Sequence, residues 1–391
     1  MDIQGLKTKA IDTVEAQCQE LIQLSLRIHD NPELGFQEDK AASWLIDYLQ
    51  ANGFQIEKCI AGLPTAFQAT YGEGRPRIAL LAEYDALPGI GHGCGHNIIA
   101  ASAAGAGIAS KPAIDSLGGS IIVLGTPGEE VFGGKIDMVK AGTFDDIDVA
   151  MMVHPDTRNL ATTQMLACVS LDVEFIGKPA HAAAQPHGGI NALEALILAF
   201  NSINSLRQHL KDEARVHGVI TDGGEAPNIV PAHSAARFLI RALDNAYLGE
   251  LKEKVLKCFE GASLASGARL KYSWGEKTYA SMKNNVTMAG LFSQNLELLG
   301  RQVELFNPDF GCGSTDMGNV SQVVPSIHPI VAIAPAEVLL HSPEFTSAAA
   351  SEDGYKGLLD AAKALAMTVV DILGQSEVLD KINQEFWGGN D

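Results

Sequence analysis

Residues 81–110 read LAEYDALPGIGHGCGHNIIAASAAGAGIAS, a pattern typical of a buried strand, a tight turn and a buried helix. The turn holds Cys94 and His96 two residues apart, after an acidic strand end that contains Glu83 and Asp85. Thiolate, imidazole and carboxylate groups bind zinc-like cations. Glycines at positions 91, 93 and 95 let the backbone turn tightly enough for both ligands to converge on one point. This stretch therefore predicts half of a metal site.

The length and composition of the chain indicate a folded protein with two domains. At 391 residues the chain is too long for one ordinary hydrophobic core. Its 46% hydrophobic and 19% charged residues exclude a disordered chain. The net charge of −19 argues against nucleic acid or an anionic membrane surface as a partner.

The sequence also bears on location. Residues 1–30 predict an amphipathic helix with charges throughout, without the apolar segment of a secretory signal. No apolar run is long enough to span a bilayer. The six cysteines, at positions 18, 59, 94, 168, 258 and 312, are widely scattered, so we expect reduced thiols and a cytoplasmic protein.

The first part of the chain alternates helical and strand-like patterns. This alternation predicts an α/β domain with a mainly parallel central sheet flanked by helices. Asp85, Glu129 and His154 each lie just after an expected strand, where open α/β sheets place their ligand sites. The expected helices cover 11–28, 38–52, 98–110 and 134–141, and the expected strands cover 65–71, 77–82, 119–125 and 148–153.

From about residue 168 the pattern becomes β-α-β-β-α-β, which predicts a ferredoxin-like α+β unit. The chain then resumes with a helix over 285–299, the GCGSTD loop, a strand over 327–333 and a long helix from Ser347. We therefore expect a metal-binding catalytic domain made of 1–168 and 279–391, with an inserted domain at 169–278. The inserted unit is expected to have strands at 169–176, 215–221, 235–243 and 269–274, and helices at 189–210 and 246–266.

Later motifs supply the other half of the metal site. GTPGEE places Glu129 and Glu130 directly after a strand, where one carboxylate can bind a cation and the other can move protons on metal-bound water. His154 ends a strand-like run, and His341 precedes the last helix. Each has a structural alternative, either a solvated acidic loop or a histidine that binds no metal. Five ligands, enough for two cations that share a bridging group, are Cys94, His96, Glu130, His154 and His341.

Two residues of the inserted unit are candidates for contact with a substrate. His181, in EFIGKPAHAAAQP, could polarise a scissile carbonyl or stabilise an oxyanion, or it could be a turn histidine. Asn228, in GGEAPNIVPAH, could bond to substrate or cap a turn. The chain has no phosphate loop ending in Lys-Ser/Thr and no Gly-x-Ser-x-Gly elbow, so neither a nucleotide site nor serine hydrolase chemistry is supported.

Taken together, these motifs resemble the dinuclear-metal aminoacylase/carboxypeptidase amidohydrolases of clan MH, metallopeptidase family twenty. Asn97, where many members have Asp, is similar to the branch of bacterial amidohydrolases and peptidase-M-twenty-domain-containing protein two. The resemblance runs nearly end to end, through IHDNPELGFQE (28–38), AEYDALPGIGHGCGHN (82–97), GTPGEE (125–130), VHPDT (153–157), GKPAHAAAQPHGGINAL (177–193), APNIVP (226–231), GSTDMGN (313–319) and LHSPEF (340–345).

The resemblance implies a role for each candidate residue. Asp85 would orient a ligand histidine, and Glu129 would be the general base. The inserted unit would be the lid and dimerisation domain of a homodimer, in which His181 reaches the partner's active site and Asn228 contacts substrate. The ligands of two divalent cations, Zn²⁺ or Mn²⁺, would be Cys94, His96, Glu130, His154 and His341.

We therefore expect metal-dependent hydrolysis of an amide bond in a small N-acyl amino acid, an aminobenzoyl-glutamate-like compound or a dipeptide. Water activated by the metal would give its proton to Glu129, attack the carbonyl and release the amine. One alternative is a metal-dependent binding protein without turnover, which a missing ligand would have favoured. Another is a thiol enzyme with Cys94 as nucleophile, although the neighbours of Cys94 suit a cation better.

Overall fold

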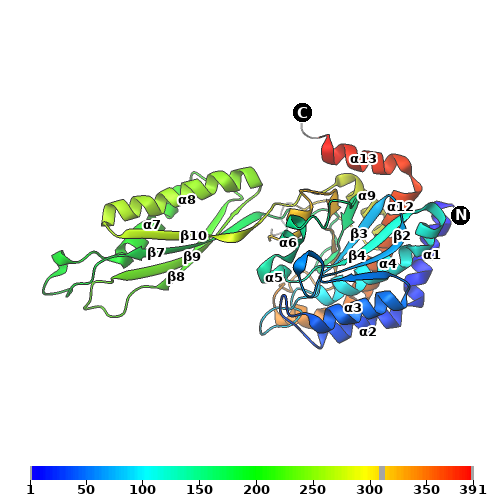
Figure 1. The fold of residues 1–391 in the computed structure, drawn as a ribbon, viewed down its shortest axis with the longest axis horizontal. Coiled ribbons are helices and arrows are strands. Elements are labelled where there is room, and N and C mark those ends of the chain that lie inside the picture. The colour runs from blue at the N-terminus through cyan, green and yellow to red at the C-terminus, as the bar shows by residue number, and fades with distance from the viewer. Residues whose placement is uncertain (1, 308–312, 389–391) are drawn as a thin grey trace. The chain divides into compact units, whose positions relative to one another are not determined.

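The computed structural model describes residues 2–307 and 313–388, which form two compact units (Figure 1). Unit 1 combines Met1–Gln164 with Met282–Asp391, and unit 2 is the intervening segment Met165–Ser281. Gly311 and Cys312, which belong to the expected GCGSTD loop, lie outside the described residues. Within the described ranges, every helix is too short or too polar to cross a lipid bilayer.

Unit 1 is built on a six-stranded sheet with the order β1-β2-β4-β3-β5-β11. The central strand β3 (Arg77–Ala82) runs parallel to β4 (Gly119–Gly125) and to β5 (Val149–Met151). Every residue of β4 is buried, as expected for a strand covered on both faces. The α/β prediction is confirmed, with antiparallel pairing confined to β1 and β2 at one edge. The remaining strands of this sheet are β1 (Gln55–Lys58), β2 (Phe67–Glu73) and β11 (Ser326–Ile327).

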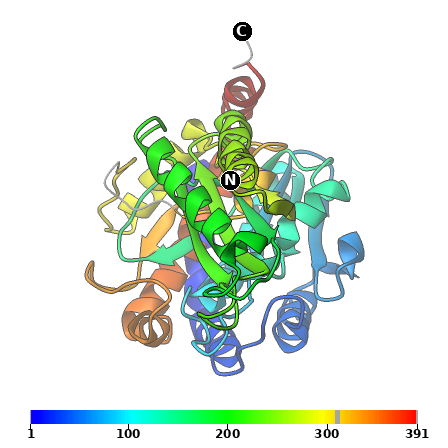
Figure 2. The same cartoon turned by 90° about the vertical axis from the view of Figure 1, so that its left-hand side faces the viewer.

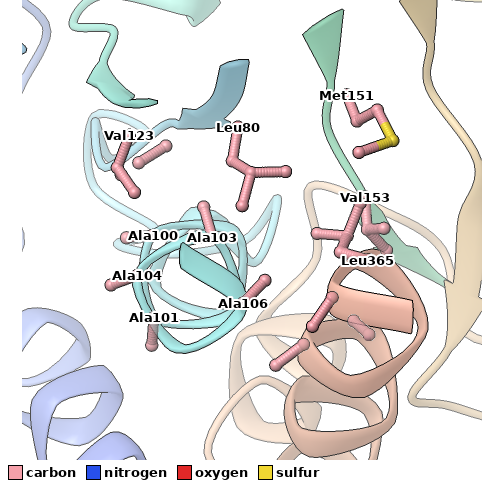
Figure 3. Packing of buried hydrophobic residues seen from close by; sticks show 14 of the residues in the cluster. Leu80, Ala100, Ala101, Ala103, Ala104, Ala106, Val123, Met151, Val153 and Leu365 are labelled. Atoms are coloured by element: carbon pink, nitrogen blue, oxygen red, sulfur yellow. The ribbon is translucent and has the colours of Figure 1, made fainter. Parts of the chain in front are cut away.

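Helix α4 (His96–Leu117) packs directly under this sheet and is buried along most of its length. Figure 3 shows its alanines facing Leu80 of β3 and Val123 of β4, with α12 (Glu352–Gly374) alongside. Small side chains on α4 allow the helix axis to approach both neighbours closely. The helix begins at His96, two residues before the expected start, so the ligand turn leads straight into it.

Two expected elements of unit 1 are wrong in detail. The single helix predicted over 11–28 is two helices, because Gln17 leaves the helical conformation and its side chain bonds to Tyr48 and Asn52. The strands predicted over 148–153 and 327–333 each end early, and the chain continues as β6 (His154–Asp156) paired with β12 (Ile330–Ala332) in a separate ladder. The other helices of unit 1 are α1 (Ile3–Ala16), α2 (Cys18–His29), α3 (Asp39–Ala51), η1 (Ile60–Gly62), α5 (Glu129–Phe132), α6 (Gly134–Lys140), α9 (Val286–Leu298), α10 (Met317–Val320), α11 (Pro343–Ala348) and α13 (Ser376–Trp387).

Unit 2 has the β-α-β-β-α-β order predicted from the sequence. Its four strands form an antiparallel sheet with the order β10-β7-β9-β8, which is the ferredoxin-like topology. Its two helices pack against each other and over one face of the sheet, and they share one hydrophobic core with it (Figures 1 and 2). The elements are β7 (Ala167–Ile176), η2 (Pro186–Gly188), α7 (Ala192–Arg207), β8 (Arg215–Asp222), β9 (His233–Ala242), α8 (Asn245–Ser266) and β10 (Arg269–Tyr279).

Candidate metal centre

All five predicted ligands come together in unit 1. Cys94 and His96 lie at the start of α4, Glu130 lies in α5 just after β4, His154 begins β6, and His341 precedes α11. Their ligand atoms form three overlapping groups in which every atom lies within 4.8 Å of the others. The groups are Cys94, His96 and His154; Cys94, Glu130 and His341; and His96, Glu129 and Glu130.

The two buried histidines are oriented by hydrogen bonds on their far nitrogens. Nδ1 of His96 lies 3.1 Å from Oδ1 of Asp85 and 2.9 Å from its carbonyl oxygen. Nδ1 of His154 lies 2.7 Å from the carbonyl oxygen of Pro155. If each Nδ1 carries a proton to its acceptor, each Nε2 presents a lone pair to the cluster, which is how metal-binding histidines are usually held.

Several ligand atoms in the cluster have no hydrogen-bond partner among the described residues. Nε2 of His96 and Oε1 of Glu130 are both buried in this state. The Sγ atom of Cys94 lies 3.4 Å from Nε2 of His154. Buried polar atoms are normally satisfied, so unsatisfied atoms that converge on one point fit a bound cation. The sulfur, nitrogen and oxygen donors are those that zinc-like cations prefer.

His341 lies at the rim of the cluster. Its Nε2 lies 3.6 Å from Oε1 of Glu130, and about half of its side chain is exposed. Its backbone adopts a left-handed conformation, with a φ of 60°, and its amide donates to the carbonyl oxygen of Gly93. This bond ties the His341 loop to the turn that carries Cys94.

The charge environment shifts the protonation of three ligands. Burial, then the carboxylate of Glu130, raises the pKa of the Cys94 thiol. Burial lowers the pKa of His96, but the effect of Asp85 outweighs it and the pKa lies well above its usual value. Burial and His96 lower the pKa of His154 to about 4. A cation must therefore displace protons from Cys94 and His96, whereas His154 is already neutral at pH 7.

Glu129 stands beside these ligands with a protonation behaviour of its own. Burial raises the pKa of its carboxyl, and the neighbouring carboxylates of Glu83 and Asp316 raise it further. A carboxyl group with a raised pKa can accept a proton and give it up again near neutral pH. Glu129 thus has the chemistry that a proton-transfer group needs.

Some residues at the cluster were not found from the sequence. Lys135 of α6 and Asp316, which precedes α10, form a buried ion cluster with Glu83. His328 is buried with its ring 5.6 Å from that of His154, and neither ring nitrogen has a hydrogen-bond partner in the described chain. The sequence offered one signal, since Lys135 is a lysine between two glycines and an apolar run.

His181 and Asn228 lie together in unit 2. The two segments are joined by a bridge between His181 and Ile229 and by a bond from the Ala182 amide to the Asn228 carbonyl oxygen. Both side chains are exposed. Nδ1 of His181 accepts hydrogen bonds from the amides of Ala183 and Ala184, at 3.3 and 3.1 Å. In the neutral ring this leaves the proton on Nε2, so His181 presents a hydrogen-bond donor to its surroundings.

A cluster of such donors at the carboxyl ends of parallel strands is typical of a metallohydrolase. Comparison with known proteins agrees with this class. Residues 168–265 match the family model described as a peptidase dimerisation domain. The chain is 36% identical to the Xaa-Arg dipeptidase of Mus musculus over 404 residues, which cover 98% of this chain and 93% of that protein. It is 31% identical over 449 residues to one of the two kinds of chain in the p-aminobenzoyl-glutamate hydrolase of Escherichia coli strain K12, covering 96% of this chain and 93% of that protein.

The fold is shared with solved structures. A Bacillus subtilis protein described as a dinuclear metal binding peptidase from the M20 family superposes with a TM-score of 0.75, at 20% identity, over 92% of this chain and 99% of that one. The chain belongs to the M20 peptidase family.

Proposed function

We propose that this protein hydrolyses an amide bond in a small N-acyl amino acid, an aminobenzoyl-glutamate-like compound or a dipeptide, with the help of two divalent cations. The observation that carries the proposal is the convergence of unpartnered ligand atoms of His96 and Glu130 beside Glu129. Membership of a peptidase family gives this cluster a reaction class.

The ligands in this proposal are Cys94, His96, Glu130, His154 and His341, and the cations are Zn²⁺ or Mn²⁺. The buried thiol and imidazoles favour Zn²⁺, and the carboxylate also suits Mn²⁺. When bound, such ions lower the pKa of a water molecule and polarise the amide carbonyl. Asp85 fixes the ring of His96, so that its Nε2 is aimed at the cation.

Glu129 acts as the general base and then as the general acid. Its carboxylate accepts the proton of the attacking water and transfers it to the nitrogen of the leaving amine. The raised pKa of Glu129 supports this role, because the acid form persists long enough to protonate a leaving group. Glu130 is held apart from this task by its contact with His341.

The inserted segment, residues 169–278, serves in this proposal as lid and dimerisation domain. His181 would donate its Nε2 proton to the developing oxyanion in the active site of the partner subunit. The acceptor bonds on its Nδ1 support that role, because they favour the donor form of Nε2. Asn228, which is exposed and adjacent in the same unit, would contact the substrate.

Two further parts of the proposal rest on chemistry rather than on geometry. The named relatives act on Xaa-Arg dipeptides and on p-aminobenzoyl-glutamate, which makes a dipeptide or an aryl-amide of an amino acid a reasonable substrate class. A thiol ligand such as Cys94 needs a reducing compartment, which supports a cytoplasmic location. The raised pKa and deep burial of Cys94 disfavour the alternative role of nucleophile.

Metal analysis followed by an amide panel tests the proposal. The purified chain is expected to hold about two metal ions and to hydrolyse at least one of several small amides. The panel contains Xaa-Arg and β-alanyl dipeptides, N-acetyl amino acids and p-aminobenzoyl-glutamate. Chelation should abolish turnover, and Zn²⁺ or Mn²⁺ should restore it. A chain that binds no metal, or whose turnover survives complete chelation, contradicts the proposal.

A further inference from the structure

A buried cluster of three charged residues lies beside the candidate ligands and has no part in the function proposed above. Nζ of Lys135 lies 2.5 Å from Oε1 of Glu83 and 2.7 Å from Oδ1 of Asp316. The backbone amide of Lys135 donates to Oδ2 of Asp316, at 2.9 Å. All three side chains are almost completely buried. Lys135 is therefore held by Asp316 at two points and fixes one oxygen of Glu83.

The second oxygen of Glu83 is turned toward the metal ligands. Oε2 of Glu83 is buried, has no hydrogen-bond partner in residues 2–307 and 313–388, and lies 3.4 Å from Nε2 of His96. Nε2 of His96 is the atom that faces the proposed cation and is itself unpartnered. Glu83 belongs to none of the three ligand groups, so it faces this nitrogen from outside the ligand set.

The charge of the cluster is not balanced within it. One ammonium group faces two carboxylates, which leaves one negative charge uncompensated in a fully buried position. Such a charge is costly in a protein interior unless a cation completes it. The free oxygen of Glu83 and the lone pair of His96 point to the same place, which is where that cation would lie.

We propose that Lys135 and Asp316 position Glu83 so that its free oxygen stabilises the cation bound to His96. Glu83 is then a positioning residue of the metal centre, and Lys135 acts through it. The inference rests on the metal centre of the proposed function and adds three residues to it. The competing explanation is structural, because the same bonds also tie the end of β3 to α6 and to the turn before α10.

Metal affinity and metal-free stability separate the two explanations. The test variant is Glu83→Gln, which keeps an acceptor for Lys135 and removes the charge. The matched control is Asp371→Asn, which alters another buried carboxylate, paired at 2.7 Å with Lys7 on the outer helices. For each protein, the Zn²⁺ affinity is measured by competition with a chelator, and the melting temperature is measured in EDTA and with Zn²⁺. The absorption spectrum of the Co²⁺-loaded protein reports the ligand environment.

Glu83→Gln is expected to weaken Zn²⁺ binding by about 10- to 100-fold and to shift the Co²⁺ spectrum. The melting temperature in EDTA should stay the same or rise, because an uncompensated buried charge is removed. Asp371→Asn should lower the melting temperature in EDTA and leave Zn²⁺ affinity unchanged. Lys135→Met, where it folds, should weaken Zn²⁺ binding as Glu83→Gln does, and Glu83→Gln alone decides where it does not.

The inference is overturned if Glu83→Gln binds Zn²⁺ as tightly as the unsubstituted chain while its melting temperature in EDTA falls. That result assigns the cluster to stability alone and leaves the proposed function standing. If the unsubstituted chain itself binds no Zn²⁺, Mn²⁺ or Co²⁺, the proposed function fails first and this inference fails with it.

Discussion

The carboxylate of Asp85 joins two parts of the metal centre, because it contacts His96 with one oxygen and the backbone of Glu130 with the other. Oδ1 lies 3.1 Å from Nδ1 of His96, and Oδ2 accepts a hydrogen bond of 3.0 Å from the amide of Glu130. One side chain after β3 thus sets the ring orientation at the start of α4 and the position of the α5 turn. Its two bonds make Asp85 a support for two ligands at once.

Asp85→Asn should therefore weaken the metal centre without removing a ligand. The Asn amide can satisfy only one of the two contacts in the same way, so either the His96 ring or the Glu130 backbone loses its acceptor. We expect Zn²⁺ affinity to fall by about 10- to 100-fold, measured by chelator competition. Asp115→Asn, which alters a surface bond to Tyr71, is the control and should bind Zn²⁺ normally. Equal affinity in both variants would show that Asp85 does not support the site.

Glu129→Gln should separate metal binding from turnover. The amide keeps the shape of the side chain but cannot accept a proton, so turnover should fall by about 10²- to 10⁴-fold. Metal content, measured by mass spectrometry of the purified protein, should stay at the unsubstituted level. Glu20→Gln, on the exposed face of α2, is the control and should keep full activity. Near-normal turnover in Glu129→Gln rules out the role of general base.

Metal binding should tighten as pH rises. The pKa of the Cys94 thiol and that of His96 both lie well above their usual values, so both groups hold protons in the metal-free protein at pH 7. A cation must displace these protons, and each displaced proton makes affinity rise by up to about tenfold per pH unit. Chelator competition between pH 6 and pH 8 measures the slope, and Cys94→Ser should reduce it. An affinity that does not change over this range contradicts the assignment of both ligands.

The sequence predicted the ligand positions better than their connections. Asp85, Glu129 and His154 follow buried strands, and the carboxyl ends of parallel strands lie at one edge of the sheet, so their meeting follows from the pattern alone. The contact between Lys135 and Asp316 joins residues 181 positions apart, and no local pattern reveals it. The left-handed backbone of His341 depends on its bond to Gly93, which forms only in the folded chain.

Helix boundaries show the same division. The small-residue run after His96 predicts a buried helix, but periodicity cannot say that it continues past Pro112 to Leu117, because tertiary packing rather than propensity sets its length. The break at Gln17 is likewise set by side-chain bonds to Tyr48 and Asn52, which lie far along the chain. In unit 2 the alternation of buried and exposed residues along β7 and β9 gave both strands correctly.

The close approach of α4 to the sheet gives a prediction for stability. Gly107 faces β4, where an added Cβ would lie 2.6 Å from Cγ2 of Val123 and 3.5 Å from the ring of Phe54. Val123 is a buried strand residue with little freedom to move, so Gly107→Ala should lower the free energy of unfolding by about 1–3 kcal/mol although alanine favours helices. Gly290→Ala in α9 is the matched control, because an added Cβ there meets no atom within 4 Å. The control should raise stability by about 0.5–1 kcal/mol, through helix propensity alone. Urea unfolding of both variants measures the difference, and a stabilising effect of Gly107→Ala would mean that α4 can move away from β4.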